Sequence, residues 1–275
     1  AFLDANLDAF YGGQRRMLVL MQALLKNHKV TLVTTGPGNL SERVSQSGIP
    51  VEVLAASPRV NQFGGQLKAL GPVRFAITGV EVAAWSLRFG SWLARNHVDA
   101  VVANDIRSML LASLGSRLAR TPLIWSVRDN VRQGRWHGVA ARFATRIVPV
   151  SYGTATVFTA SEREQAGNKL IVIHNGVPVA EPRADARAAL RAQMGLVTDD
   201  VSPVVIHVGM LTPRKGHADW FKATAAVVAA GGVSPQLAVI GDEPAGYYGY
   251  QASLRALAED LGITDRVHWF GFRED

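Results

Sequence analysis

Two adjacent cations, Arg214 and Lys215, lie in a Gly/Pro-rich stretch, HVGMLTPRKGH, that follows the β-branched run 204–206. The run predicts a buried strand, and the residues after the stretch predict a helix. Cations at the N-terminal end of a helix oppose its dipole, so a bound anion is the economical explanation for the pair. Gly209 lets the backbone approach such a ligand closely.

Two other glycine-containing loops follow predicted strands. FYGGQRR places Gly12 and Gly13 before a predicted helix, whose free N–H groups can meet a phosphate; a plain glycine turn is the alternative. VIGDEPAG offers Gly241 for close approach and Asp242 or Glu243 to accept hydrogen bonds from hydroxyl groups. A turn with exposed acids explains this second loop equally well.

The stretch VRDNVRQGRWH gathers Arg128, Arg132 and Arg135 beside Asp129 at the end of a predicted strand. Arginine binds phosphate or carboxylate with two parallel hydrogen bonds, so this loop predicts an anion site. A solvated basic face is an equally good interpretation. The stretch GPGNLS, residues 36–41, resembles a dinucleotide fingerprint, but it lacks the third glycine, which favours an ordinary turn.

Several common chemistries lack their signatures in this sequence. It contains no cysteine, no Asp-x-Asp pair, no His-Glu-x-x-His, no Gly-x4-Gly-Lys-Ser/Thr and no Gly-x-Ser-x-Gly. We therefore expect no metal site and no cofactor. Nucleic-acid binding would rest on charge alone, since no recognised module is present, and no nucleic-acid partner is expected.

The elements that must position these loops alternate between strand and helix. Strands are predicted at residues 1–5, 29–35, 49–54, 98–105, 122–129, 146–151, 203–208, 235–241 and 266–270, and helices at 14–27, 39–48, 78–96, 107–119, 136–144, 184–194, 217–231 and 247–261. This alternation is typical of βαβ units, which form parallel sheets with helices on both faces. Ligands of such α/β folds bind at the carboxyl ends of the strands.

A segment between two alternating series, KLIVIHNGVPVAEPRAD at 169–185, predicts a strand, an Asn-Gly turn and a Pro-rich linker. We place the domain boundary in it, with residues 1–170 as an N-terminal domain and residues 171–275 as a C-terminal domain. The second series has three clear strands and no closing helix. We therefore expect the second domain to be incomplete and the sequence to be part of a longer chain.

Charge is divided unevenly between these halves. The chain of 275 residues has a net charge of +7, of which residues 1–170 contribute +10 and residues 171–275 contribute −3. A basic half attracts phosphates, anionic lipid or nucleic acid, although a generally cationic surface explains the excess equally well. The lack of cysteine suits a reducing compartment, and we see no secretory signal, so we expect a cytoplasmic protein.

Taken together, these stretches resemble those of the GT-B glycosyltransferases, specifically the retaining group called family 4. The resemblance covers essentially the whole sequence and rests on the order and spacing of the motifs. GGQRR resembles the family's Gly-Gly-x-x-Arg, with Gly12, Gly13 and Arg16 in matching places, and HVGMLTPRKGH matches its strand–Gly–Pro–Arg/Lys–Lys–Gly signature. Further similar stretches are VVANDIRSMLLA, VPVSYGTATVF, VIHNGVPV, LAVIGDEP and VHWFGFRED.

The resemblance implies two Rossmann-like, doubly wound domains whose parallel sheets face a cleft, the second domain being incomplete. It implies a retaining, metal-independent transfer of a sugar from a UDP-, GDP- or ADP-sugar to a hydroxyl of a glycan, lipid or small molecule. Arg214 and Lys215 would stabilise the leaving diphosphate, and no protein nucleophile is required. The N-terminal domain would serve the acceptor and the C-terminal domain the nucleotide-sugar.

The other expected site residues combine this resemblance with the loops above. The donor-binding set is Gly12, Gly13, Gly209, Arg214, Lys215, Gly241 and Asp242, and the acceptor or sugar side holds Arg16, Arg128, Asp129 and Asn175. Many family members place a sugar-contacting histidine where this sequence has Arg128, which is a departure. The family's paired glutamates, Glu-x7-Glu, lie beyond Asp275, so we expect half of the donor site outside this sequence.

Two other functions stay open at this point. One is a non-catalytic, degenerate GT-B protein that binds nucleotide or a partner protein, and the other is a different GT-B enzyme such as a sugar-nucleotide epimerase. A further hypothesis concerns the basic, aromatic-containing region 57–96. It would make a peripheral contact with an anionic membrane on the cytoplasmic face, against the alternative of an ordinary helix packed on the sheet.

Overall fold

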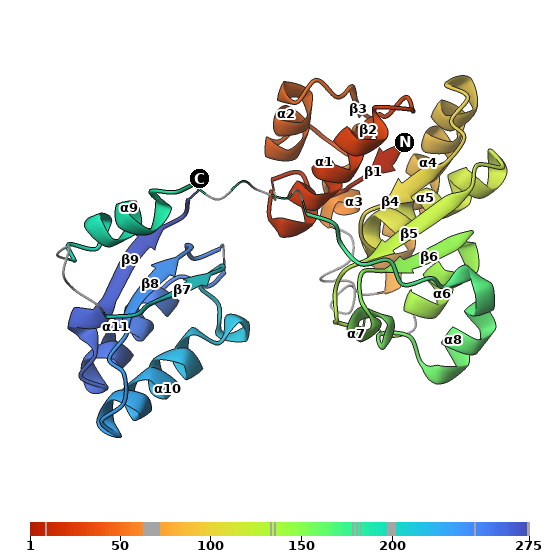
Figure 1. Ribbon diagram of the computed structural model, residues 1–275. Helices are drawn as coiled ribbons and strands as arrows, with labels where there is room; N and C mark the ends of the chain where they lie inside the picture. The colour runs from red at the N-terminus through yellow and green to blue at the C-terminus, as the bar shows by residue number, and fades with distance from the viewer. Residues whose placement is uncertain are drawn as a thin grey trace. The chain divides into compact units, whose positions relative to one another are not determined.

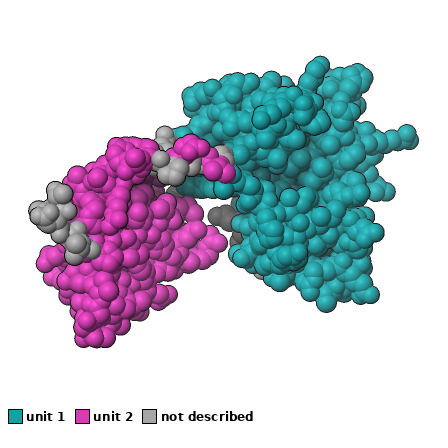
Figure 2. Space-filling model, viewed as in Figure 1, with its two compact units in different colours: residues 1–178 teal, residues 179–275 magenta. Residues whose placement is uncertain are grey.

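The structure, a computed structural model, describes residues 1–8, 10–62, 72–132, 134, 136–177, 179, 181, 183–196, 202–244 and 246–273 (Figure 1). The chain divides into two compact units, Ala1–Pro178 and Val179–Asp275 (Figure 2). No helix within those ranges is both long enough and apolar enough to cross a membrane.

The first unit is built on a sheet of six parallel strands in the order β3-β2-β1-β4-β5-β6. The strands are β1 (Phe2–Leu3), β2 (Leu32–Thr34), β3 (Val51–Val53), β4 (Val101–Ala103), β5 (Leu123–Val127) and β6 (Arg146–Pro149). The strand order reverses between β1 and β4. The loops that follow these two strands therefore diverge and leave room for a ligand at the carboxyl edge of the sheet.

Helices cover both faces of this sheet. They are α1 (Gly12–Leu24), α2 (Asn39–Gln46), α3 (Pro58–Gln62), α4 (Pro72–Arg95), α5 (Ile106–Leu118), α6 (Trp136–Phe143), α7 (Tyr152–Ala155) and α8 (Ala160–Ala166). Neighbouring residues of β1 point to opposite faces: Phe2 packs in a cluster with Met17 and Met21 of α1, whereas Leu3 belongs to a cluster with Trp85 and Phe89 of α4. A parallel sheet buried on both faces follows from this alternation.

Helices α4 and α5 approach so closely that their backbones touch. A methyl group on Gly115 would come within 2.0 Å of the carbonyl oxygen of Ser86, and one on Gly90 would come within 2.7 Å of the carbonyl oxygen of Gly115. The N–H of Gly115 also donates to Oγ of Ser86 at 2.9 Å. Glycine is required for this contact. It fixes α5, which begins directly after β4, against the rest of the unit.

The second unit has three parallel strands in the order β7-β8-β9, which repeats the order β1-β2-β3 of the first unit. Its elements are α9 (Ala186–Gln193), β7 (Val204–Val208), α10 (His217–Ala229), β8 (Gln236–Ile240), α11 (Tyr250–Asp260) and β9 (Val267–Gly271), with a 3-10 turn at Pro213–Lys215. Its core contains Phe221 of α10, Leu254 of α11 and Leu237 and Val239 of β8.

One edge of β7 is not covered by the described residues. In the first unit the corresponding strand, β1, has β4 on that side. The exposed apolar side chains of β7 are Val205, Ile206 and Val208, at 40%, 49% and 72% exposure. The groove between α9 and β7 measures about 530 Å³. The second sheet as described is thus half of the pattern seen in the first.

The predicted alternation of strands and helices in parallel sheets is confirmed. Three short helices were not predicted, namely α3, α7 and α8, and α4 begins at Pro72 rather than at residue 78. The amphipathic pattern did not predict the first turns of α4, because Val73 and Ile77 are apolar residues that lie on the exposed face of the helix. α7 and α8 are one or two turns long, and their starts depend on the capping side chains of Ser151 and Thr159.

The strand predicted at the start of 169–185 is wrong. Leu170 forms a single bridge with Ile147 of β6. The N–H groups of Ile171 and Ile173 then donate to the carbonyl oxygens of Ile147 and Pro149 at 2.9 and 3.0 Å, without a continuous strand. Ile171 and Ile173 are about half exposed, so the apolar run that suggested a buried strand lies on the surface of the unit.

Replacing Gly115 with alanine tests the contact between α4 and α5. Gly115→Ala is expected to lower the free energy of unfolding of the first unit by about 1–3 kcal/mol, because the added methyl group forces the helices apart. Gly79→Ala is the matched control, since Gly79 lies in α4 with open space around it and alanine favours a helix by up to about 1 kcal/mol. Urea unfolding followed by circular dichroism measures both. Equal stability of the two variants would contradict the close contact.

Candidate functional site

The carboxyl group of Asp4 is fully buried at the end of β1, beside the reversal in strand order. It accepts hydrogen bonds from Nδ2 of Asn104 at 2.5 Å, from Nε2 of Gln14 at 3.2 Å and from the backbone N–H of Asn6 at 2.8 Å. Burial, and then repulsion from Asp105, raises the pKa of Asp4. Three segments therefore converge on one carboxyl group at the carboxyl edge of the sheet.

Arg128 lies against the loop that contains the two glycines. Its Nε donates to the carbonyl oxygen of Asn104 at 3.0 Å, while its buried NH1 has no hydrogen-bond partner among the described residues. A methyl group on Gly13 would lie 2.3 Å from that NH1, whereas nothing lies within 4 Å of such a group on Gly12. Gly13 thus makes room for Arg128, and Gly12 stays open to a ligand.

Two guanidinium groups repel one another at this edge. Burial lowers the pKa of Arg16, and the charge of Arg128 lowers it further. The pKa of Arg128 is also lowered by burial, partly offset by the carboxylates of Asp4, Asp105 and Asp129. Of the predicted acceptor-side residues, Arg16, Arg128 and Asp129 are therefore brought together. An anion bound beside the two guanidinium groups would relieve the repulsion.

The fourth predicted acceptor-side residue, Asn175, lies apart from this cluster in the extended segment after β6. It is exposed, and no hydrogen bond joins it to Arg16, Arg128 or Asp129 in the part of the chain that the structure describes. Its neighbour His174 packs edge-to-face on Tyr152, with ring centroids 5.9 Å apart.

The predicted arginine cluster does not act as one anion site. NH1 and NH2 of Arg132 donate to the two carboxylate oxygens of Glu162 at 2.7 and 2.9 Å, and this pairing lowers the pKa of Glu162 to about 2. The interpretation of Arg132 as a phosphate ligand is therefore wrong, because its guanidinium group already binds the carboxylate of Glu162. Arg135 lies outside the described residues. Beside Arg128, a cavity of about 20 Å³ has room for about one water and no substrate.

A polar scaffold that the sequence did not reveal holds the loop after β1. Nδ2 of Asn6 donates to Asp105 at 2.6 Å, and Arg107 donates to Oδ1 of Asn6 at 2.9 Å and to the carbonyl oxygens of Ala5 and Asn61. Asp105 also caps α5 by accepting from the N–H of Ser108. The signal available in the sequence was the Asn-Asp pair after a strand, which is typical of a helix cap.

In the second unit, Arg214 and Lys215 lie in the 3-10 turn that directly precedes α10, as predicted. Both side chains are exposed, and neither forms a hydrogen bond or an ion pair with the residues that the structure describes. The N-cap of α10 is Gly216, with φ +75°, so no side chain meets the free N–H groups of the first turn. Two exposed cations without partners therefore lie directly before an uncapped helix start, which is an arrangement that favours a bound anion.

The loops after β7 and β8 are joined through their backbones. Gly241 has φ +147°, and a methyl group on it would come 1.8 Å from the carbonyl oxygen of Gly209. The N–H of Gly209 donates to Ile240 and that of Leu211 to Asp242, both at 2.9 Å. The side chain of Lys215 lies 3.8 Å from the position of a methyl group on Gly209. The predicted residues Gly209, Lys215, Gly241 and Asp242 therefore form one group.

The two acids of VIGDEPAG have different tasks. The carboxylate of Glu243 accepts from the backbone N–H groups of Gly249 and Gln251 and so holds the start of α11. Asp242 is exposed and accepts from the N–H of Glu243 at 2.8 Å through Oδ1. Its second oxygen is the one that can accept from a ligand hydroxyl.

A pair of stacked imidazoles that the sequence did not reveal lies behind the cationic loop. The rings of His207 and His217 are 4.0 Å apart and nearly parallel. Burial, followed by the charges of His207 and Lys215, lowers the pKa of His217 to about 4. The pKa of His207 is lowered by burial and by Lys215. Both rings are therefore neutral at pH 7, and the positive charge of the loop resides on Arg214 and Lys215.

Comparison with known proteins places these two groups of residues in context. Residues 11–176 match the family described as Glycosyl transferase 4-like domain. No curated protein sequence matches the chain. HepE of Anabaena, solved in complex with UDP, is 21% identical over 99% of this chain and 69% of its own, with a TM-score of 0.72. A glycosyltransferase of Rickettsia africae is 12% identical over 100% and 68%, with a TM-score of 0.74.

The likeness extends to other glycosyl-transferring enzymes. Sucrose-phosphate synthase of Thermosynechococcus elongatus is 17% identical over 99% of this chain and 70% of its own, with a TM-score of 0.66. At these identities the solved structures establish the fold, and they confirm the predicted α/β, GT-B architecture with two Rossmann-like units. Since the family match alone takes in more than half of the chain, the protein belongs to the glycosyl transferase 4-like family and is a glycosyltransferase.

Proposed function

We propose that the protein transfers a sugar, with retention and without a metal ion, from a nucleoside-diphosphate sugar to a hydroxyl of a glycan, lipid or small molecule. The observation that carries the proposal is the pair of unpaired cations, Arg214 and Lys215, before the uncapped start of α10. The likeness to HepE, which was solved with UDP and with UDP-glucose, supports a UDP-sugar first, with GDP- and ADP-sugars as the alternatives.

The proposed chemistry depends on charge that develops on the leaving group. As the bond between the anomeric carbon and the phosphate oxygen breaks, negative charge grows on the diphosphate. Arg214 and Lys215, which directly precede α10, stabilise that charge. Two cations supply what a divalent ion supplies in other transferases, and the sequence contains no Asp-x-Asp pair to hold such an ion.

Retention follows from attack on the same face of the sugar. The acceptor hydroxyl forms the new glycosidic bond as the diphosphate departs, and its proton passes to the departing phosphate oxygen. No side chain is needed as a nucleophile or as a general base. In this scheme the open backbone at Gly12 and the joined loop of Gly209 and Gly241 approach the donor, and Asp242 accepts from a donor hydroxyl.

We assign Arg16, Arg128 and Asp129 to the sugar and acceptor side. The repulsion between Arg16 and Arg128 supports this role, because an anionic ligand at this edge would offset it. Asn175 keeps its predicted place on the same side. The proposed place of action is the cytoplasm.

Removing the two cations tests the donor site. The double variant Arg214→Ala, Lys215→Ala is expected to weaken UDP binding by about a hundredfold or more, since it removes two charge-assisted interactions with the diphosphate. Lys222→Ala, which removes an exposed cation further along α10, is the matched control and should bind as the wild type does. Isothermal titration calorimetry with UDP, GDP and ADP measures both. Unchanged binding in the double variant, or no binding of any of the three by the wild type, would refute the assignment.

Two arginines from the same loop allow a second test. Arg128→Gln is expected to slow the release of nucleoside diphosphate from the accepted donor by about tenfold or more, because it removes one of the charges assigned to the sugar and acceptor side. Arg132→Gln breaks the pair with Glu162 and is expected to lower Tm while leaving the rate per folded molecule unchanged. The rates come from a diphosphate-release assay and Tm from calorimetry. A normal rate for Arg128→Gln would remove Arg128 from the site.

The membrane contact proposed for region 57–96 rests on the first turns of α4. Val73 and Val80 are 71% and 70% exposed, and Phe75 packs on Trp136 with ring centroids 6.4 Å apart. Exposed apolar side chains beside basic ones favour an anionic bilayer surface. Residues 63–71 of this region lie outside the described part of the chain.

Vesicle co-sedimentation tests this contact. The double variant Val73→Ser, Val80→Ser is expected to lose most of its binding to phosphatidylglycerol vesicles, because it removes the apolar groups that enter the bilayer surface. Val233→Ser, which changes an exposed valine of the second unit, is the control. Equal binding of the wild type to phosphatidylglycerol and to neutral phosphatidylcholine vesicles would exclude the anionic contact.

A further inference from the structure

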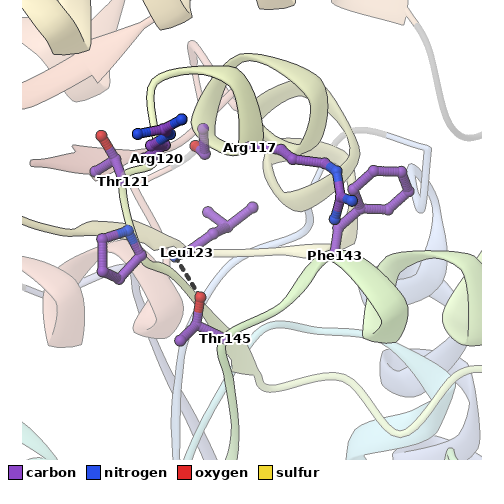
Figure 3. A pocket seen from close by; sticks show the side chains of 8 residues that line it. Arg117, Arg120, Thr121, Leu123, Phe143 and Thr145 are labelled. Carbon is purple, nitrogen blue, oxygen red and sulfur yellow. Dashed lines mark hydrogen bonds between the residues drawn. The ribbon is translucent and has the colours of Figure 1, made fainter.

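A second pocket lies in the first unit at the amino end of β5, where α5 and α6 end (Figure 3). It measures about 240 Å³ and is lined by Ser116, Arg117, Arg120, Thr121, Pro122, Leu123, Phe143 and Thr145. The carboxyl ends of the strands, where Arg128 and Gly13 lie, are at the opposite edge of the same sheet. The pocket is therefore separate from the site described above.

The end of α5 explains where the arginines of this pocket come from. The N–H of Thr121 donates to the carbonyl oxygen of Ser116 at 2.9 Å, and that of Arg120 donates to the carbonyl oxygen of Arg117 at 3.2 Å. These two bonds form a Schellman motif, which satisfies the last carbonyl groups of the helix. The guanidinium groups are thus not required to cap the helix.

Arg120 occupies the position of this motif where glycine is favoured. Its φ is +57°, in the left-handed region of backbone conformation that residues other than Gly and Asn seldom adopt. A strained residue persists where the surroundings or a function maintain it. Here the strained residue adds a second guanidinium to the lining of the pocket, beside the one that Arg117 supplies from the last turn of α5 (Figure 3).

Several side chains that line the pocket have hydrogen-bond donors without an acceptor. The guanidinium groups of Arg117 and Arg120 form no hydrogen bond or ion pair within the described ranges, and no carboxylate lines the pocket. Ser116 is 1% exposed, and its Oγ has no partner there either. Oγ1 of Thr145 accepts from the N–H of Leu123 at 3.1 Å, which leaves its own O–H free to donate.

We propose that this pocket binds a phosphate monoester. A phosphate group presents only acceptor oxygens, which match two exposed guanidinium groups and the hydroxyl group of Thr145. Phe143, 38% exposed, lies across the pocket from Arg120 and offers an apolar surface to the carbon part of the ligand (Figure 3). The volume is below the range of about 300–1,000 Å³ typical of drug-sized ligands, so the bound part is a small one.

The same phosphate chemistry has two sources, a soluble sugar phosphate or the headgroup of phosphatidic acid. Glucose 6-phosphate is the soluble probe, uncharged glucose its control, and vesicles containing phosphatidic acid represent the lipid. Calorimetry with the full chain measures the first two, and co-sedimentation measures the third. Saturable binding of at least one phosphate probe, with none of glucose, is expected.

Variants separate this pocket from the proposed nucleotide site. Arg117→Ala and Arg120→Gly are each expected to weaken binding of the phosphate probe by about tenfold or more. Arg120→Gly also relieves the left-handed strain, so its Tm should not fall and loss of binding cannot be due to unfolding. Arg95→Ala removes an exposed arginine of α4 outside the pocket and should bind as the wild type does.

The double variant Arg214→Ala, Lys215→Ala should also retain the phosphate probe, whether or not it loses UDP, so the two proposals succeed or fail independently. The pocket proposal is refuted if neither phosphate probe binds, if Arg117→Ala and Arg120→Gly bind as tightly as Arg95→Ala, or if loss of Arg214 and Lys215 alone abolishes binding. If Arg117→Ala and Arg120→Gly weaken only the binding to phosphatidic acid vesicles, the natural ligand is the lipid headgroup. If they weaken only the binding of glucose 6-phosphate, the natural ligand is a soluble phosphate ester.

Discussion

The buried carboxyl group of Asp4 is the constraint on which the site of the first unit depends. Strands β1 and β4 end side by side where the strand order reverses, and Asp4 accepts hydrogen bonds there from Asn104 and Gln14. A buried carboxyl group without such bonds would destabilise the fold, so all three side chains are held in place. Arg128 bonds to the carbonyl oxygen of Asn104 and takes its position from the same network.

Positive charge gathers at the candidate site of each unit. Arg16 and Arg128 repel one another in the first unit, and Arg214 and Lys215 lie unpaired in the second, within the part of the chain that the structure describes. Arg132, by contrast, has a carboxylate partner, Glu162. A cation that no carboxylate offsets is available to an anionic ligand.

Local features were predictable from the sequence, and long-range ones were not. The alternation of strands and helices follows from side-chain periodicity, and the place of Arg214 and Lys215 before a helix follows from neighbouring Gly and Pro residues. The pairing of Arg132 with Glu162 joins residues 30 positions apart, and that of Asp4 with Asn104 joins residues 100 apart. Sequence spacing carries no signal for such contacts, so Arg132 was assigned to the wrong task and Asp4 was overlooked.

The backbone contact between Gly209 and Gly241 has a mechanical consequence. The two loops pack so closely that a methyl group on Gly241 would lie 1.8 Å from the carbonyl oxygen of Gly209, and they are bonded again through Leu211 and Asp242, so they cannot fluctuate separately. A ligand that restricts the motion of the loop with Arg214 and Lys215 would also restrict the motion of the loop with Asp242. A contact with Asp242 would then cost less conformational entropy than the contact with the cations. Recognition of the two ends of one ligand would then be cooperative, although neither loop changes its shape.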